Sequence, residues 1–329
     1  MLNFNKISLP RRGLLTGASV LAAASALGLA SGPARAFAPM ATDNAPYLYR
    51  FKLGDADATM VSDGILPLGE PSANFTNITK EEIQRQLKDN FLPLDKIVLQ
   101  QNVLVLNTSG KTVLFDTGMG SLKLFGPTTG QLMNTLNRAG IDPKSIDAVV
   151  MSHAHIDHCG GVMADDGTSH FPNAQLYITQ ADYDFWTDKQ KVGDQFKVFW
   201  ETATKNLVPN RDRIHFIRDG EEFLPGIQAI LAPGHTVGHT IFMISSGGQQ
   251  LCYIGDLTHH PVLLMEKPLT QFKYDTDPVQ SSHSRVKMLT MLADSRTPVL
   301  AYHFAWPGIG NVAKQGEGFH YYPAPMQLQ

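Results

Sequence analysis

The sequence predicts an α/β protein with an αββα sandwich, in which two β-sheets pack face to face and helices cover their outer faces. Apolar strands come first, then helices, then further strands and helices, an order that suits two sheets with helices outside. The content of 43% hydrophobic and 17% charged residues is ordinary for a globular protein and allows a sizeable core. Each cluster of histidines also directly follows an expected strand. Functional residues commonly lie on loops that a rigid scaffold of strands holds in place.

Local signals define the elements of the first half of the chain. Gly54-Asp55 reads as a turn between two strands, and Thr79-Lys80-Glu81-Glu82 is a capping box that opens a helix ending near Asn90. A second helix over 130–139 is expected to stop at Gly140. The strands expected in this half span 48–53, 58–61, 98–106, 112–115, 148–152 and 175–179.

The second half begins with aromatic-rich helices over 181–206 and continues with strands. Gly247-Gly248 is expected to turn a hairpin. A helix over 281–292 precedes a last strand over 299–302. The other strands expected here span 214–217, 227–231, 241–245 and 251–254.

The N-terminus resembles an export signal. Basic residues that include the pair Arg11-Arg12 precede an apolar run over 14–29, and Ala34-Arg35-Ala36 follows as a cleavage signal. The arginine pair resembles a twin-arginine signal, so we expect residues 1–36 to direct export to the periplasm or the exterior. A membrane anchor is the alternative, but the run is short and rich in Ala and Gly. Residues 37–329 would then form one folded domain.

Charge and cysteine content narrow the classes of partner. Loss of residues 1–36 removes four basic residues and no acidic one, which takes the net charge from −3 to −7. An acidic surface argues against nucleic acid and anionic membranes as partners. Cys159 and Cys252 lie in apolar or Gly-rich motifs, so buried thiols are favoured over a disulfide.

The segment Ser152-His153-Ala154-His155-Ile156-Asp157-His158 carries the strongest chemical signal. His153 and His155 alternate, so both can reach one metal ion, while Asp157 and His158 can turn toward a second. Imidazole and carboxylate are ligands that zinc and similar divalent ions prefer. A chance polar loop is a poor explanation, because the chain has only twelve histidines.

Three later segments complete the pattern. His235 follows Pro233-Gly234, which lets the backbone come close to a metal site, and His239 is expected to orient a ligand or the loop rather than to bind. Asp256 ends a strand, where its carboxylate could bridge two ions. His303 follows the last expected strand, and its place in this ordered series makes it a candidate ligand.

These motifs, in this order over residues 100–305, resemble the metallo-β-lactamase superfamily. Phe115-Asp116-Thr117-Gly118 is similar to that family's early Asp-Thr-Gly turn, in which the Asp supports the metal loop. Within the superfamily the chain resembles the methyl parathion hydrolase group, on segments around the metal motifs. These segments are Leu124-Phe125-Gly126-Pro127-Thr128, Phe171-Pro172-Asn173-Ala174, Asp184-Phe185-Trp186, Leu224-Pro225-Gly226-Ile227 and Phe304-Ala305-Trp306-Pro307-Gly308-Ile309-Gly310.

The resemblance implies a homodimer of hydrolase domains over residues 37–329, with two divalent ions in each chain. Zinc is favoured, and manganese, cobalt and iron are alternatives. One ion would be held by His153, His155 and His235, and the other by Asp157, His158 and His303. Asp256 would bridge the two ions, with Asp116 and His239 supporting the ligands.

The expected reaction is hydrolysis of a neutral, hydrophobic ester by a hydroxide shared between the ions, with Asp256 and Asp157 as catalytic carboxylates. The sequence shows no cluster of Arg and Lys that would clamp a charged group. Phosphotriesters of the methyl parathion type, lactones and aryl esters therefore fit. The expected pocket residues are Phe125, Trp186, Phe196, Phe199 and His259.

Other functions are open alternatives. An acyl-homoserine lactone lactonase and a β-lactamase are the nearest, although a bridging Asp256 suits the second less. Glyoxalase II would need a basic patch for glutathione, and a nuclease is disfavoured by the acidic charge. A single-iron dioxygenase would not need Asp157, His158 and His303 together. A metal-binding protein without catalysis would leave no coordination position open.

Overall fold

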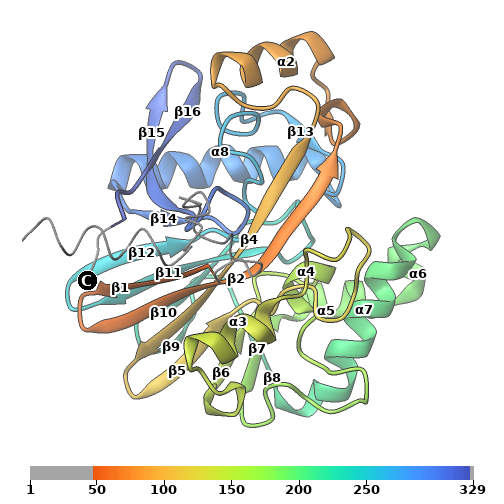
Figure 1. Cartoon of the computed structure of the whole chain (residues 1–329), viewed down its shortest axis with the longest axis vertical. Coiled ribbons are helices and arrows are strands. Elements are labelled where there is room, and N and C mark those ends of the chain that lie inside the picture. The colour runs from red at the N-terminus through yellow and green to blue at the C-terminus, as the bar shows by residue number, and fades with distance from the viewer. Residues whose placement is uncertain (1–46, 327–329) are drawn as a thin grey trace, which may run out of the picture. The chain divides into compact units, whose positions relative to one another are not determined.

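A computed structural model describes residues 47–326, so the expected export signal over 1–36 lies outside the described residues. Residues 46–329 group into one compact unit, whose described part contains two seven-stranded sheets (Figure 1). Within residues 47–326 no helix combines the length and the hydrophobicity that a bilayer span requires. The αββα sandwich expected from the sequence is confirmed.

The first sheet has the order β1-β2-β4-β5-β6-β7-β8. Its first four strands pair antiparallel, and β5 to β8 pair parallel. The strands are β1 (Leu48–Leu53), β2 (Ala56–Gly69), β4 (Ile97–Thr108), β5 (Lys111–Phe115), β6 (Ala148–Val150), β7 (Gln175–Thr179) and β8 (Ile214–Ile217).

The second sheet has the order β16-β15-β14-β12-β11-β10-β9, and only β12 and β14 pair parallel. The strands are β9 (Glu222–Leu224), β10 (Ile227–Leu231), β11 (Thr240–Ser246), β12 (Gln249–Tyr253), β14 (Val299–Leu300), β15 (Ile309–Gln315) and β16 (Gly318–Pro323). A small third sheet pairs β3 (Phe75–Thr76) with β13 (Gln271–Phe272).

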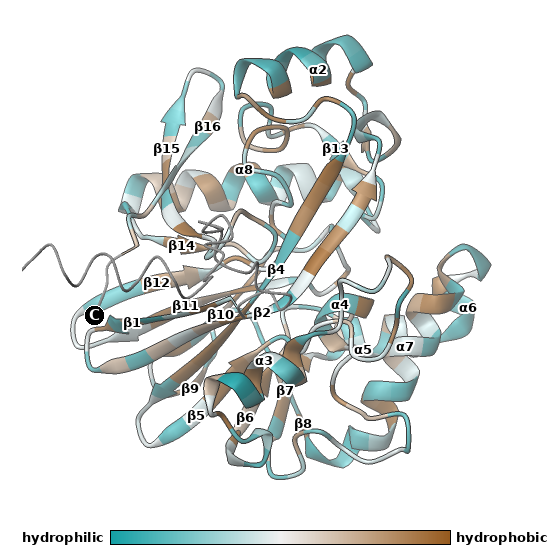
Figure 2. Cartoon of the chain, viewed as in Figure 1, coloured by the Kyte–Doolittle hydropathy of each residue, from teal (hydrophilic) through white to brown (hydrophobic). Residues whose placement is uncertain are grey.

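The two large sheets share one apolar core. Phe115 of β5 packs against Phe242 of β11 and Tyr253 of β12, with ring centroids 5.8 and 5.3 Å apart. Burial of such aromatic rings stabilises the sandwich, at about 25 cal/mol per Å² of apolar surface removed from water. Figure 2 shows hydrophobic residues along the strands and hydrophilic residues on α2.

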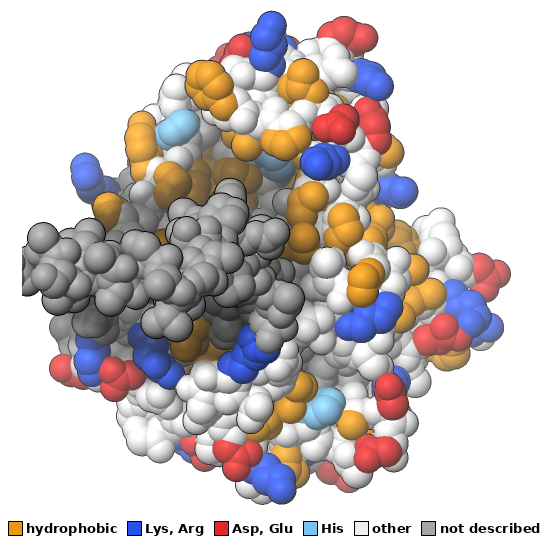
Figure 3. All heavy atoms as spheres, viewed as in Figure 1, with side chains coloured by type: hydrophobic (Ala, Val, Ile, Leu, Met, Phe, Trp, Pro, Cys, Tyr) orange, Lys and Arg blue, Asp and Glu red, His pale blue; other side chains and the backbone are white. Residues whose placement is uncertain are grey.

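Helices lie outside the sheets. Most follow strands of the first sheet, whereas the longest, α8, packs against β15 of the second. On the face drawn in Figure 3, basic and acidic side chains are interspersed over α2 and α6. The helices are α2 (Lys80–Asp89), α3 (Leu132–Ala139), α4 (Ile156–Cys159), α5 (Gln180–Trp186), α6 (Lys189–Val192), α7 (Lys197–Leu207) and α8 (Pro278–Ser295).

Several elements differ from expectation. β2 runs to Gly69 instead of Val61, because register shifts near Gly64 and Pro67 let it stay paired with β4. The helix expected from Gly130 begins at Leu132, although it ends at the left-handed Gly140 as predicted. The strand over 299–302 is not the last, since the β15–β16 hairpin follows it.

Candidate metal centre

Four segments that are far apart in sequence bring their histidines and carboxylates to one end of the sandwich. The loop after β6 and the short α4 carry His153 to His158, from the first sheet. The second sheet contributes His235 after β10, Asp256 after β12 and His303 after β14. All seven expected ligands are buried: His153, His155, Asp157, His158, His235, Asp256 and His303.

The Asp256 carboxylate lies at the middle of this group. Its Oδ2 is 3.2 Å from His235 Nε2 and 3.3 Å from His158 Nε2, and 3.7 Å from His153 Nε2. Its Oδ1 is 3.2 Å from His303 Nε2. One carboxylate therefore faces imidazoles from the other three segments, which is the placement that a bridging ligand needs.

The possible ligand atoms form two adjoining sets and a third that overlaps both. His153, His155, His235 and Asp256 offer atoms that all lie within 4.8 Å of one another, and Asp157, His158 and His303 do the same. The third set is Asp256, His259 and His303. Asp157 Oδ2 lies 3.6 Å from His158 Nε2 and 3.5 Å from His303 Nε2. The division matches the two ligand sets implied by the resemblance.

The chemistry of these atoms fits two divalent cations. His153 Nε2 and His235 Nε2 face each other at 3.2 Å. The buried Nε2 atoms of His155 and His158 and the buried Oδ1 of Asp256 have no hydrogen-bond partner. Buried polar atoms are normally paired, so ring nitrogens and a carboxylate oxygen that converge without hydrogen bonds point to cations as their partners.

Asp116 supports the first loop from below. Its carboxylate accepts hydrogen bonds from the Ser152 backbone N–H at 2.8 Å and from the Tyr253 hydroxyl at 2.7 Å. It also lies 2.8 Å from His158 Nδ1. This contact places the Nδ1 proton toward Asp116 and aims His158 Nε2 at Asp256, which is the support expected of Asp116.

His239 holds the backbone of Asp256 rather than facing the ligand atoms. Its Nδ1 donates to the Ala232 carbonyl at 3.1 Å, and its Nε2 accepts from the Asp256 N–H at 3.0 Å. Both contacts require a neutral ring. Burial, with the neighbouring His235, lowers the pKa of His239 to about 3 and keeps it neutral.

Two carboxylates that the sequence analysis missed hold the ligand loops. Asp182 accepts from the N–H groups of Ala154 and Gly238, at 2.8 and 2.7 Å, and so joins the first loop to the second. Asp275 Oδ1 lies 2.8 Å from His235 Nδ1. Neither belongs to a recognisable motif, because each acts on residues distant in the sequence.

The ligand histidines differ in their affinity for protons. Burial, followed by the nearby imidazoles, lowers the pKa of His153 and His155 well below the ordinary value. Burial also opposes charging of His158, but Asp256, Asp157 and Asp116 outweigh it and raise its pKa well above 6.5. Cation binding must therefore displace a proton from His158, which makes the affinity for metal rise with pH.

A cavity of about 340 Å³ opens above the ligands, and three expected pocket residues, Phe125, Phe199 and His259, line it. Tyr274 and Phe272 are further aromatic residues of its wall. The other lining residues are Leu66, Leu68, Leu99, His155, Ile156, Asp157, His235, Asp256 and His303.

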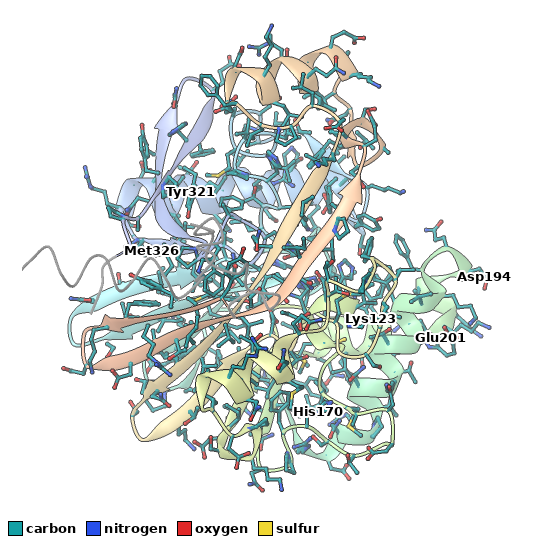
Figure 4. The ribbon with its side chains drawn as sticks, in the orientation of Figure 1. Lys123, His170, Asp194, Glu201, Tyr321 and Met326 are labelled. Carbon is teal, nitrogen blue, oxygen red and sulfur yellow. The ribbon has the colours of Figure 1, made fainter. Side chains whose placement is uncertain are left out.

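An outer groove of about 1370 Å³ adjoins this inner cavity and shares Phe125, Phe199 and Tyr274 with it. Phe196 lines the groove and not the inner cavity. The groove continues along the segment between α6 and α7, where Asp194 lies (Figure 4). These shared aromatic rings form the passage from the groove to the metal ligands.

Trp186, expected as a pocket residue, lines neither the inner cavity nor the outer groove. Its side chain is 1% exposed, and its ring lies 4.7 Å from that of His155 and 5.8 Å from that of Phe199. Trp186 therefore backs a ligand histidine from inside the helical layer. The expectation of buried, unpaired thiols is confirmed for Cys159 and Cys252.

Comparison with known proteins agrees with this geometry. The family model described as "Metallo-beta-lactamase superfamily" matches residues 97–299. An N-acyl homoserine lactonase of Bacillus cereus is 26% identical over 204 residues, which cover 57% of this chain and 75% of the relative. A lactonase of Bacillus sp is 28% identical over 159 residues, 43% of this chain, and the match spans 57% of its length.

Solved structures show the same likeness. AidC, described as a dizinc quorum-quenching lactonase in complex with a product, superposes with a TM-score of 0.80 at 30% identity, over 87% of this chain and 100% of AidC. The hydrolase AbOPH, described as in the beta lactamase superfamily, also gives 0.80, with the same coverage of both chains, at 24% identity. That second likeness concerns the fold.

Proposed function

This chain belongs to the metallo-β-lactamase superfamily, and on that premise we propose that it is a two-metal lactonase that opens N-acyl homoserine lactones. The observation that carries the proposal is the convergence of seven possible metal ligands, five of which line a largely apolar cavity. The expected class of a metal-dependent hydrolase acting on ester bonds is confirmed by the lactonase relatives.

The lactone is favoured over the phosphotriester that the sequence resemblance suggested first. The relatives described above are N-acyl homoserine lactonases, and the match to AidC extends over that whole chain. These relatives do not support the finer resemblance to methyl parathion hydrolases. A phosphotriester therefore becomes one arm of the test rather than the main proposal.

The metal ions are proposed to be zinc, held in the two ligand sets with Asp256 between them. Two bound divalent ions would supply an activated water near neutral pH and polarise the ester carbonyl. The protein holds the ligands rigidly, because buried groups fix the rings of His158 and His235 from behind. In the metal-free chain His158 and His303 outweigh burial and hold the pKa of Asp256 well below the ordinary value.

Three cavity residues are placed to handle the reacting groups. Ring opening breaks the acyl carbon–oxygen bond, and the leaving alkoxide must gain a proton. Asp157 and Asp256 line the cavity, and either carboxylate could take the proton that the attacking water gives up and pass it to this oxygen. His259 also lines the cavity, and burial lowers its pKa to about 3, so a neutral ring faces the substrate.

The cavity suits a neutral substrate with an apolar tail. Among the described residues that line the inner cavity there is no Lys or Arg to bind an anion. Aliphatic and aromatic side chains make most of its wall, as is usual for pockets that bind small apolar ligands. The acyl chain would leave past Phe125 and Phe199 into the outer groove.

The experiment is a comparison of rates on four substrates with one preparation of zinc-loaded protein. The substrates are a hexanoyl homoserine lactone, methyl parathion, an aryl ester and a cephalosporin. The proposal predicts that kcat/KM is highest for the lactone, and that a chelator removes this activity. Faster hydrolysis of methyl parathion than of the lactone would contradict the proposal and indicate a phosphotriester as the substrate.

Export and a homodimer are separate proposals. The arginine pair and apolar run of residues 1–36 support export to the periplasm or the exterior. Fractionation of cells that make the full-length chain tests this, with Arg11→Lys/Arg12→Lys as the variant that should stay inside. The mass of the mature protein in solution tests the dimer.

A further inference from the structure

The buried carboxylate of Asp275 connects a metal-facing histidine to the wall of the cavity. Its Oδ1 lies 2.8 Å from His235 Nδ1, and both side chains are buried. The backbone makes a parallel connection, because the N–H of Thr276 donates to the carbonyl of His235 at 2.9 Å. Asp277 N–H likewise donates to the Gly234 carbonyl at 2.8 Å.

Arg285 of α8 anchors the other side of this carboxylate. Its guanidinium lies 3.9 Å from Asp275 Oδ2 and is fully buried. It donates to the carbonyls of Leu257, Pro268 and Thr270 at 3.0, 2.7 and 2.7 Å. A planar guanidinium with several fixed donors suits this role, because one group can hold both ends of a chain segment.

The segment over 257–275 that Arg285 holds forms part of the cavity wall. It carries His259, Phe272 and Tyr274, all of which line the inner cavity. The same buried pair therefore contacts a metal ligand at one end and the substrate wall at the other. The first turn of α8 also closes against the second ligand loop, since a Cβ at Gly234 would approach Ser281 N to 2.0 Å.

We propose that Asp275 is a positioning residue that fixes the ring of His235 for metal binding, and that Arg285 ties this carboxylate to the cavity wall. The inference rests on the two-metal site of the proposed function. A carboxylate behind a ligand histidine fixes the ring and makes it a better ligand, and its loss commonly costs 10- to 100-fold in metal affinity.

A purely structural role for Asp275 predicts a different effect of its replacement. Asp275 could serve only to neutralise Arg285, in which case its replacement would lower the stability of the fold and leave metal affinity unchanged. The distance from Asp275 to His235 is shorter than its distance to Arg285, at 2.8 against 3.9 Å, and so favours action on the histidine. Metal affinity is the measurement that separates the two roles.

The experiment is a zinc titration of the metal-free variant Asp275→Asn against a competing chelator, with circular dichroism to check the fold. One of the two binding steps should weaken by about 10- to 100-fold. Asp275→Glu serves as a second variant, because it keeps the charge and should bind more tightly than the Asn variant. Unchanged affinity for both ions in Asp275→Asn would overturn the proposal.

Asp277→Asn is the matched control. Asp277 is exposed, lies two residues from Asp275 and caps α8 by accepting from the N–H of Gln280 at 2.9 Å. An asparagine there keeps the cap, so both binding steps should stay within twofold of the native protein. Equal losses of zinc affinity in Asp275→Asn and Asp277→Asn would show a general effect on this segment. That result would also overturn the assignment of Asp275 as a positioning residue.

Arg285→Lys tests the link to the wall. Lysine cannot donate to three carbonyls in the arrangement of a guanidinium, so KM for a lactone should rise several-fold even when zinc is saturating. An unchanged KM would remove Arg285 from the proposal. If the native protein binds two ions but hydrolyses no lactone, the proposed substrate fails while the Asp275 assignment stands or falls on its own titration.

Discussion

The carboxylate of Asp182 accepts a hydrogen bond from the backbone N–H of Ala154 at 2.8 Å, between the two first histidines of the metal loop. The same side chain accepts from Gly238 N–H and from the Thr236 hydroxyl, at 2.7 and 3.0 Å. A residue of α5 therefore joins the loops of the two sheets. The correct spacing of ligands from different sheets depends on this contact.

Asp182→Ala should lower both stability and metal affinity. Three buried donors would lose their partner, which costs about 3 kcal/mol or more in the free energy of unfolding. Urea unfolding and zinc titration measure the two effects. Asp184→Ala, an exposed change two residues along α5, should alter neither; an Asp182 variant that behaves like this control would disprove the joining role.

His259→Phe should test whether His259 acts in the reaction. The phenyl ring can keep the stacking on Phe272, whose centroid lies 4.0 Å away, but it removes the contact of His259 Nε2 with Asp256 Oδ2 at 3.0 Å. We expect kcat for a lactone to fall on the order of 100-fold, as when one polar contact at a reacting centre is lost. Zinc titration of the variant measures any change in metal binding, and a normal kcat would exclude a catalytic role for His259.

Phe125→Ala should affect long acyl chains more than short ones. Phe125 lines both the inner cavity and the outer groove, so a chain that passes between them must contact it. Loss of one aromatic contact of about 1–2 kcal/mol raises KM for a ten-carbon chain about 5- to 30-fold. Phe216→Ala on β8, outside both cavities, is the control. Equal changes in KM for four- and ten-carbon acyl chains in Phe125→Ala would show that the acyl chain does not pass Phe125.

His260 should make the stability of the metal-free protein depend on pH. Burial lowers its pKa to about 4 from 6.5, so the folded state keeps a neutral ring while the unfolded chain binds a proton. The free energy of unfolding must then fall as pH drops from 6.5 through 4. His260 Nδ1 accepts from the N–H groups of Val262 and Leu263, which an asparagine can also satisfy.

His260→Asn should therefore flatten this dependence without removing the local hydrogen bonds. Urea unfolding between pH 4 and 7 in the presence of a chelator gives the comparison with the native protein. A slope equal to that of the native chain would show that another group titrates in this range.

Local signals in the sequence were enough for much of the fold. The Thr79 cap of α2 and the left-handed Gly140 after α3 formed as expected, because capping depends on neighbours within one turn. The β15–β16 hairpin was missed. β15 holds Gly310, Asn311 and Lys314 among its seven residues, which weakens the apolar pattern of a strand, and it pairs with β14, which only the tertiary structure brings near.

The residues of the site also divide into those that the sequence reveals and those that it does not. The seven expected ligands could be recognised because motif order and residue type carry the information, and the structure brings them together. Asp182 and Asp275 could not, since their partners lie 28 and 40 residues away. Trp186 was wrongly expected to line the pocket, because an aromatic residue on a helix has the same sequence signal whether it faces a pocket or the core.

The most direct test is a zinc titration of metal-free mature protein, with lactone hydrolysis followed at each addition. We predict tight binding of two zinc ions per chain, with activity that rises until the second site fills. Asp256→Asn, which alters the carboxylate placed between the two ligand sets, should lose the second ion and most of the activity. Lactone hydrolysis at full rate before any zinc is added would contradict the account.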